Sequence, residues 1–96
     1  IETCYSVMVR GDSMKDAGIG DGDIVVVDKA LEAKDGDFVV AFIDGDFTIK
    51  QFKMDKSGEY GWLVPYNSGY SPIRITADND FLVWGVVTYT IKKMHG

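Results

Sequence analysis

An Asp-Gly pair between two apolar runs constrains the fold of this chain more than any other feature. Asp44-Gly45 separates the apolar run Phe38–Ile43 from a second run, Phe47–Met54. Asp-Gly between such runs is a strong signal for a β-hairpin with a two-residue turn. The first run contains no polar residue, which indicates a buried strand, and it is far shorter than the roughly 20 residues of a membrane span. The sequence therefore predicts a sheet with this hairpin inside it.

Similar short runs recur along the chain and are separated by turn residues. Eleven glycines and two prolines in 96 residues favour many turns and leave little room for helices. One helical turn is expected at Lys29–Lys34, ending at Asp35-Gly36. Further strands are predicted at Cys4–Arg10, Ile24–Val27, Tyr60–Pro65, Ile73–Thr76 and Phe81–Lys92. The pattern predicts one all-β domain over residues 1–96, with seven or eight mostly antiparallel strands in a partly closed barrel.

Charge excludes several classes of function. The net charge is −5, which argues against nonspecific binding to a phosphate backbone, and no zinc-finger or helix-turn-helix pattern is present. We therefore expect no direct DNA binding by this chain. The acidic residues lie mostly in turns and indicate solvated loops. Those at Asp21, Asp23, Asp35 and Asp37 lack the spacing and closing Glu of a calcium loop, so no metal or cofactor is predicted.

The cysteine content and the first ten residues indicate the cellular compartment. A single cysteine, Cys4, excludes an internal disulfide and fits a reducing compartment. The first ten residues mix polar and apolar side chains and do not resemble a secretory leader. We therefore expect a cytoplasmic protein without a membrane segment.

A nucleophilic serine here would need a base other than histidine. The only histidine, His95, is next to last in the chain, so a Ser-His pair is not expected. Lysine is the remaining candidate base, and Ser–Lys pairs are a known variant of this chemistry. A lysine acts as a base only when neutral. Its pKa must fall from about 10.4 to near 7, at a cost of about 4–5 kcal/mol, and burial among apolar groups supplies such a shift.

Ser13 and Lys50 are the candidate pair. Lys50 lies in an otherwise apolar strand, where alternation places it on one face with Thr48 and Phe52. Each residue also has a simpler explanation. A lysine in this position can protect an edge strand from aggregation, and a serine in a Gly-Asp-Ser stretch is commonly a turn residue. These residue patterns alone leave both alternatives open.

Four segments in order resemble the LexA/UmuD family of Ser–Lys self-cleaving peptidases. Their spacing includes 37 positions from Ser13 to Lys50, as in the family pattern. The last segment is closer to the UmuD branch than to LexA or phage repressors. The segments are Gly11-Asp12-Ser13-Met14, Gly20–Val27, Gly45–Lys50, and Asn67–Ile73 together with Trp84–Val87. The resemblance covers nearly the whole chain and implies a LexA/signal-peptidase-like β domain.

The resemblance also implies a mechanism. Ser13 is the nucleophile, Lys50 is its base, and the backbone N–H groups of Asp12 and Ser13 stabilise the oxyanion. The family cleaves its own N-terminal arm between a small residue or Cys and Gly. No such bond precedes Ser13 in this chain, so we expect a trimmed UmuD-like domain that lacks the arm and its cleavage site.

Function and partners follow from the same resemblance. It implies an SOS-response serine peptidase whose trimmed form is an accessory subunit for translesion DNA synthesis. A RecA filament on single-stranded DNA and an error-prone polymerase subunit are the implied partners. The alternatives are the peptidase and dimerisation domain of a LexA- or phage-type repressor, or a non-catalytic binding module.

The last predicted strand, Phe81–Lys92, is the candidate dimer contact. Both of its faces carry apolar atoms between Val86 and Ile91, so one face can pack on the core while the other binds a partner. A strand at a sheet edge also exposes unpaired backbone groups. We therefore expect a homodimer formed through this C-terminal strand. The alternative is an internal strand with a solvated tail.

Overall fold

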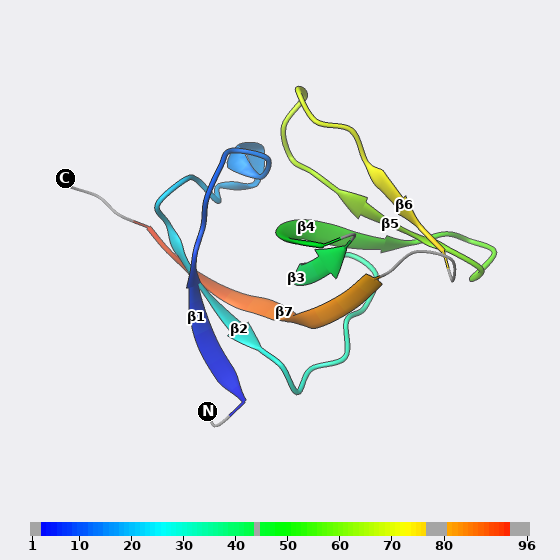
Figure 1. Cartoon of the computed structure of the whole chain (residues 1–96), viewed down its shortest axis with the longest axis horizontal. Helices are drawn as coiled ribbons and strands as arrows, with labels where there is room; N and C mark the ends of the chain where they lie inside the picture. Colours follow the sequence, from blue (N-terminus) through cyan, green and yellow to red (C-terminus); the bar gives the residue numbers. More distant parts are fainter. Residues whose placement is uncertain (1–2, 44, 77–80, 93–96) are drawn as a thin grey trace.

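The computed structural model describes residues 3–43, 45–76 and 81–92. Its strands form one seven-stranded sheet in the order β1-β2-β7-β3-β4-β5-β6, and every pair is antiparallel (Figure 1). The elements are β1 (Cys4–Met8), the 3₁₀ helix η1 (Lys15–Ala17), β2 (Ile24–Asp28), β3 (Phe38–Ile43), β4 (Asp46–Met54), β5 (Gly61–Val64), β6 (Ile73–Ile75) and β7 (Phe81–Ile91). The all-β prediction is confirmed. The outer strands β1 and β6 do not pair with each other, so the described sheet is open rather than a closed barrel.

The predicted hairpin is present at the centre of the sheet. Strands β3 and β4 pair with Ile43 opposite Asp46, which leaves a two-residue connection. Gly45 in this connection has a φ of +94°, in the left-handed region that glycine adopts without strain. Asp44 lies outside the described residues.

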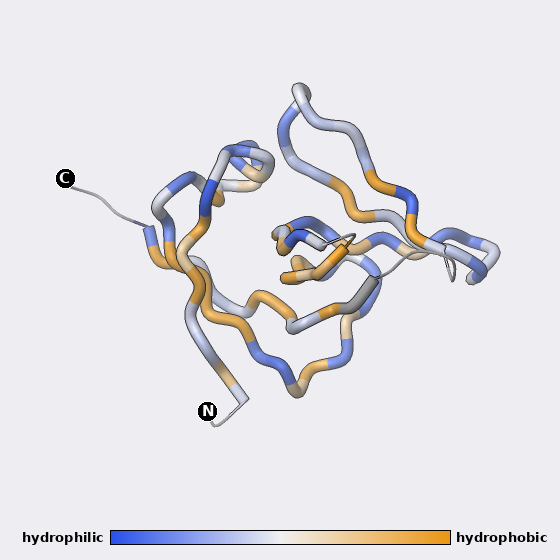
Figure 2. Tube along the Cα trace, viewed as in Figure 1, coloured by the Kyte–Doolittle hydropathy of each residue, from blue (hydrophilic) through white to orange (hydrophobic). Residues whose placement is uncertain are grey.

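Strand β3 is buried on both faces. Val39, Ala41 and Ile43 pack in one apolar cluster, whereas Val40 packs in another. This arrangement explains the uninterrupted apolar run, because no position of the strand is left for a solvated side chain. Hydrophobic segments accordingly follow the central strands, while the connecting loops are largely hydrophilic (Figure 2).

The second cluster anchors the loop that carries Ser13. Met14 and Ile19 from this loop are each only 2% exposed and pack with buried valines of β2 and β3. Burial of two large apolar side chains holds the loop against the sheet.

One local prediction was wrong, and one short helix was missed. Residues 29–34 form a turn and irregular backbone rather than a helical turn. The Asp28 carboxylate accepts from the Ala30 N–H at 2.9 Å and the Asp37 carboxylate accepts from the Lys34 N–H at 2.9 Å, so side chains replace helical partners. The short helix η1, in contrast, was not predicted, and it ends at Gly18 with a φ of +82°.

Strand β7 is internal, and each of its halves pairs on one side. Residues 81–86 pair with β3 and residues 86–91 pair with β2. The expectation of a sheet-edge strand is therefore wrong as stated, because both neighbours are present. Beyond Val86, however, the side facing away from β2 has no strand partner among the described residues.

Gly85 allows the strands to cross closely at this point. A Cβ built on Gly85 would lie 2.5 Å from Cγ1 of Val27 and 3.0 Å from the carbonyl oxygen of Asp28. Both pairings of β7 also shift register close to this residue. The sequence has a glycine here because β2 occupies the space that a side chain would need.

Candidate active site

Ser13 lies in the loop that connects β1 to β2. Two backbone hydrogen bonds close the base of this loop, from Val9 N–H to Asp23 O at 2.8 Å and from Gly22 N–H to Val9 O at 2.9 Å. The buried side chain of Met14 then fixes the backbone next to Ser13. The serine is thus held on an anchored loop, half-exposed at its surface.

Lys50 approaches Ser13 from strand β4. Its Nζ lies 2.9 Å from Ser13 Oγ, within hydrogen-bond distance, across 37 positions of sequence. The same Nζ donates to Thr48 Oγ1 and, at 3.1 Å, to the carbonyl oxygen of Ile49. The structure therefore brings the two predicted residues together and fixes the amine with two further acceptors.

Burial lowers the pKa of Lys50. The residue is 7% exposed, and desolvation penalises its charged form. In the described part of the chain no carboxylate forms an ion pair with Lys50 that would oppose this shift. The environment thus favours the neutral amine, which is the form that can accept a proton.

Tyr66 connects the Ser13 loop to the strand of Lys50. Its backbone N–H donates to Ser13 O at 2.8 Å, and its carbonyl accepts from Asp16 N–H at 2.8 Å. Its hydroxyl donates to Oε1 of Gln51, the buried neighbour of Lys50, at 2.7 Å. Sequence reasoning missed this residue, because nothing local to Tyr66 indicates contacts with residues so distant in sequence.

The segment after Tyr66 holds Asp12. The Asn67 side-chain amide donates to Asp12 O at 2.8 Å, and the Tyr70 hydroxyl donates to the Asp12 carboxylate at 2.8 Å. The backbone N–H groups of Asp12 and Ser13 donate to no other group in the described ranges. These are the two donors that the sequence predicts for an oxyanion.

A cleft of about 210 Å³ opens beside Ser13. One wall comes from the end of β1 and the loop after it, and the other from β3 and β4. The lining residues are Val7, Met8, Val9, Arg10, Gly11, Ser13, Met14, Val40, Phe47, Thr48 and Ile49. The walls are mostly apolar side chains and backbone, a surface suited to an extended peptide segment.

Three further features concern residues 3–43, 45–76 and 81–92. No group of three or more His, Cys, Asp or Glu side chains is placed to hold a metal ion there. Cys4 is a half-buried free cysteine. No described helix is long and apolar enough to cross a membrane.

Comparison with known proteins identifies the family. The model of the Peptidase S24-like family matches residues 2–88. Among curated relatives, LexA repressor 1 of Xanthomonas axonopodis pv. citri (strain 306) is 43% identical over 89 residues, 93% of this chain and 43% of the relative. LexA repressor of Mycobacterium leprae (strain Br4923) is 44% identical over 92 residues, 96% of this chain and 37% of the relative.

These relatives change the predicted branch of the family. A third relative, LexA repressor of Alcanivorax borkumensis (strain ATCC 700651 / DSM 11573 / NCIMB 13689 / SK2), is 47% identical over 74 residues, 77% of this chain and 35% of the relative. All three are named as LexA repressors, so the comparisons favour the LexA alternative over the UmuD-like assignment. The chain spans about two fifths of the length of the first two relatives. The chain belongs to the Peptidase S24-like family.

Proposed function

We propose that this chain is the Ser–Lys peptidase and dimerisation domain of a LexA-type repressor, which cleaves a peptide bond in its own polypeptide. The observation that carries the proposal is the 2.9 Å contact between Lys50 Nζ and Ser13 Oγ in a buried environment. A lysine that only protected a sheet edge would keep its charge in water. The burial of Lys50 supports the catalytic interpretation instead.

The proposed reaction begins with proton transfer. Neutral Lys50 takes the hydroxyl proton of Ser13, and Ser13 Oγ attacks the scissile carbonyl carbon to form a tetrahedral intermediate. The N–H groups of Asp12 and Ser13 donate to the resulting oxyanion. Protonated Lys50 then gives its proton to the leaving amine as the C–N bond breaks. Water, deprotonated by Lys50, hydrolyses the remaining Ser13 ester.

The cleft beside Ser13 is the proposed binding site for the scissile segment. Its apolar walls suit small and aliphatic side chains, which agrees with the Ala-Gly or Cys-Gly bond that the family resemblance implies. The polypeptide that supplies this bond would also carry any DNA-binding element of a repressor. We assign no DNA contact to these 96 residues, whose net charge is −5.

We also propose a homodimer through the second half of β7. Among the described residues, the side of residues 87–91 that faces away from β2 has no strand partner. Tyr89 is 71% exposed and Ile91 is 55% exposed on this segment. Two copies could pair these segments about a two-fold axis and cover the apolar side chains. A RecA filament that stimulates cleavage is a proposed partner on the resemblance alone, and the relatives lend no support to a polymerase subunit.

The test is self-cleavage of an extended chain. An N-terminal arm with one Ala-Gly bond is added to the chain. The protein is then incubated at alkaline pH, and the masses of the products are measured by mass spectrometry. We expect cleavage at that bond and none in the Ser13→Ala variant. Equal cleavage in the Ser13→Ala variant would contradict the proposal.

A further inference from the structure

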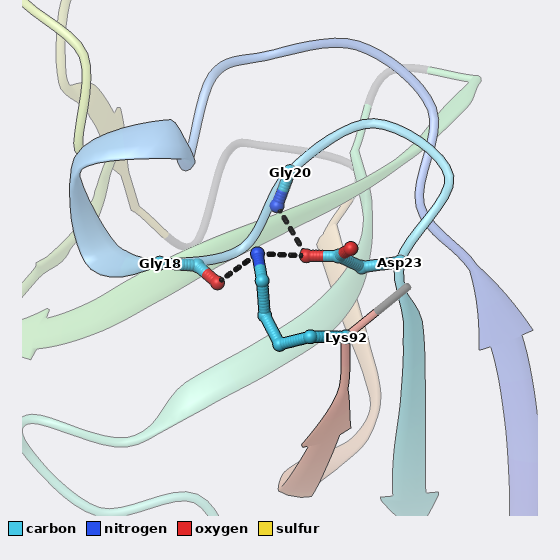
Figure 3. Close-up of polar contacts among 4 residues, drawn as sticks. All are labelled: Gly18, Gly20, Asp23 and Lys92. Atoms are coloured by element: carbon cyan, nitrogen blue, oxygen red, sulfur yellow. Dashed lines mark hydrogen bonds and ion pairs between the residues drawn. The ribbon is translucent and has the colours of Figure 1, made fainter. Parts of the chain in front are cut away.

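A second lysine binds the loop that carries Ser13, at residues other than those near Lys50. Lys92 follows the last residue of β7, and its Nζ donates to Asp23 Oδ2 at 2.6 Å and to Gly18 O at 2.9 Å (Figure 3). Asp23 precedes β2 directly, and Ile24 pairs with Ile91. The ion pair therefore extends the β2–β7 ladder by one position, into the base of the loop.

The carboxylate in this contact is buried. Asp23 is 5% exposed, whereas the Lys92 side chain is half-exposed. Asp23 Oδ2 also accepts from the Gly20 N–H at 2.7 Å (Figure 3). The same Asp23 oxygen therefore accepts from both the Lys92 ammonium and a backbone N–H of the loop. Removing the ammonium would take a cation away from this buried carboxylate, and breaking a buried ion pair in this way is destabilising.

The Lys92 contact is connected to Ser13 through a few hydrogen bonds and covalent bonds of the loop. Gly18, which accepts from Lys92, donates its own N–H to Lys15 O at 3.1 Å, and Ile19 N–H donates to Met14 O at 3.3 Å. Met14 is the neighbour of Ser13. The segment from Gly18 to Asp23 is therefore held by Lys92 at both of its ends and supports the backbone on which Ser13 sits.

We infer that Lys92 is a positioning residue for the nucleophile, acting through Asp23 and the Gly18 carbonyl. It touches neither Ser13 nor the cleft, and it fixes the loop in the geometry that keeps Ser13 Oγ beside Lys50. The inference deepens the proposed function and rests on it. Misplacement of a reacting group by about 1 Å can reduce a rate by about 100-fold, so a distant contact of this kind can matter to the reaction.

The test measures the reactivity of Ser13 without a peptide substrate. Diisopropyl fluorophosphate reacts with an activated serine: the Oγ–P bond forms, fluoride leaves, and the hydroxyl proton goes to the base. The rate is followed by mass spectrometry on the 96-residue chain across a range of pH. We expect Lys92→Met to lower the plateau rate by about 10-fold or more, while the pH of its inflection, which reports Lys50, stays unchanged.

Three further variants make the result specific. Lys92→Arg keeps the charge and the donors and should retain a rate within about threefold of the unmodified chain. The double variant Lys92→Met/Asp23→Asn also removes the negative charge of the carboxylate that faces Lys92, and should recover part of the loss. Lys53→Met, which removes an exposed lysine of β4, is the matched control and should react at the unmodified rate. If Lys92→Met does not fold, Lys92→Gln is measured against the same criterion.

Amide hydrogen exchange gives a readout that is independent of reactivity. In Lys92→Met, the Ile19 and Gly20 amides should exchange faster, while the amides of β5 remain unchanged. A folded Lys92→Met chain with the unmodified rate and unmodified loop exchange would overturn the inference and leave the proposed function standing. A Lys50→Met chain that reacts as fast as the unmodified one would instead overturn the proposed function.

Discussion

Lys50 Nζ and Ser13 Oγ lie 2.9 Å apart, although their residues are 37 positions apart and belong to different elements, strand β4 and the loop after β1. The loop after β1 supplies Ser13. The central hairpin supplies Lys50, which pairs with Val39 on the neighbouring strand β3. The reactive pair thus depends on the sheet order, and its properties depend on how deeply Lys50 is buried.

Burial of Lys50 should appear in the stability of the protein. Because its pKa is lowered in the folded state, the unfolded chain binds a proton that the folded chain has released between that pKa and the ordinary value of 10.5. The contribution of Lys50 to the free energy of unfolding should therefore rise with pH through this window, and should stay constant at its lower value below the window. Lys50→Met should be at least as stable at neutral pH. Urea unfolding at several pH values measures both chains, and a constant difference between them would contradict the lowered pKa.

Tyr66→Phe should lower stability although it removes only one oxygen. The buried Gln51 uses its amide nitrogen on Gly36 O, so its Oε1 would lose the Tyr66 hydroxyl and remain unpaired. The expected loss is about 1–3 kcal/mol in the free energy of unfolding. Tyr70→Phe is the matched control, since that hydroxyl bonds an exposed carboxylate and should cost about 0.5 kcal/mol or less. Equal effects of the two changes would contradict the bridging role of Tyr66.

Gly85→Ala should destabilise the sheet by about 1–3 kcal/mol or more, because the added methyl group would meet Val27 and the backbone of Asp28. Gly69→Ala is the control, since the nearest atom to a Cβ there is Asn67 Oδ1 at 3.4 Å. Thermal unfolding of both variants checks the difference. A normal melting temperature for Gly85→Ala would mean that β2 and β7 do not cross as closely as described.

Much of the fold could be predicted from the sequence because its signals are local. The Asp-Gly turn and the apolar runs each report a strand from neighbouring residues alone, and these strands are present with ends shifted by one or two residues. The helical turn at Lys29–Lys34 was wrong because Asp28 and Asp37 bind the backbone of that segment. The insertion of β7 between β2 and β3 could not be predicted, since pairing between distant strands leaves no local pattern.

The residues of the candidate site were likewise predictable only in part. Residue chemistry named Ser13 and Lys50 as one possibility, and family resemblance singled them out. The contacts to the Ser13 loop from Tyr66, Asn67 and Lys92 come from segments far away in the sequence. Each of these residues is an ordinary loop or strand-end residue until the fold places it beside the Ser13 loop.

Dimer formation should depend on Tyr89, whose side chain lies on the half of β7 that lacks a second strand partner. We expect the unmodified chain to be a dimer at tens of micromolar and Tyr89→Asp to be a monomer, since a carboxylate buried in the contact would have no partner. Leu31→Asp alters another exposed hydrophobic residue, in the β2–β3 connection, and should leave the dimer intact. Light scattering measures the molar mass of each chain in solution, and a monomeric unmodified chain would refute this contact.

If Lys50 is the base that activates Ser13, the rate of Ser13 modification must follow the titration of Lys50. The rate constant for reaction with diisopropyl fluorophosphate is measured for the unmodified chain and for Lys50→Met over the alkaline range. We expect the unmodified rate to rise along one titration with an apparent pKa below the ordinary lysine value of 10.5, and Lys50→Met to react slowly without this inflection. The same rate and the same pH profile in both chains would contradict the role of Lys50 as this base.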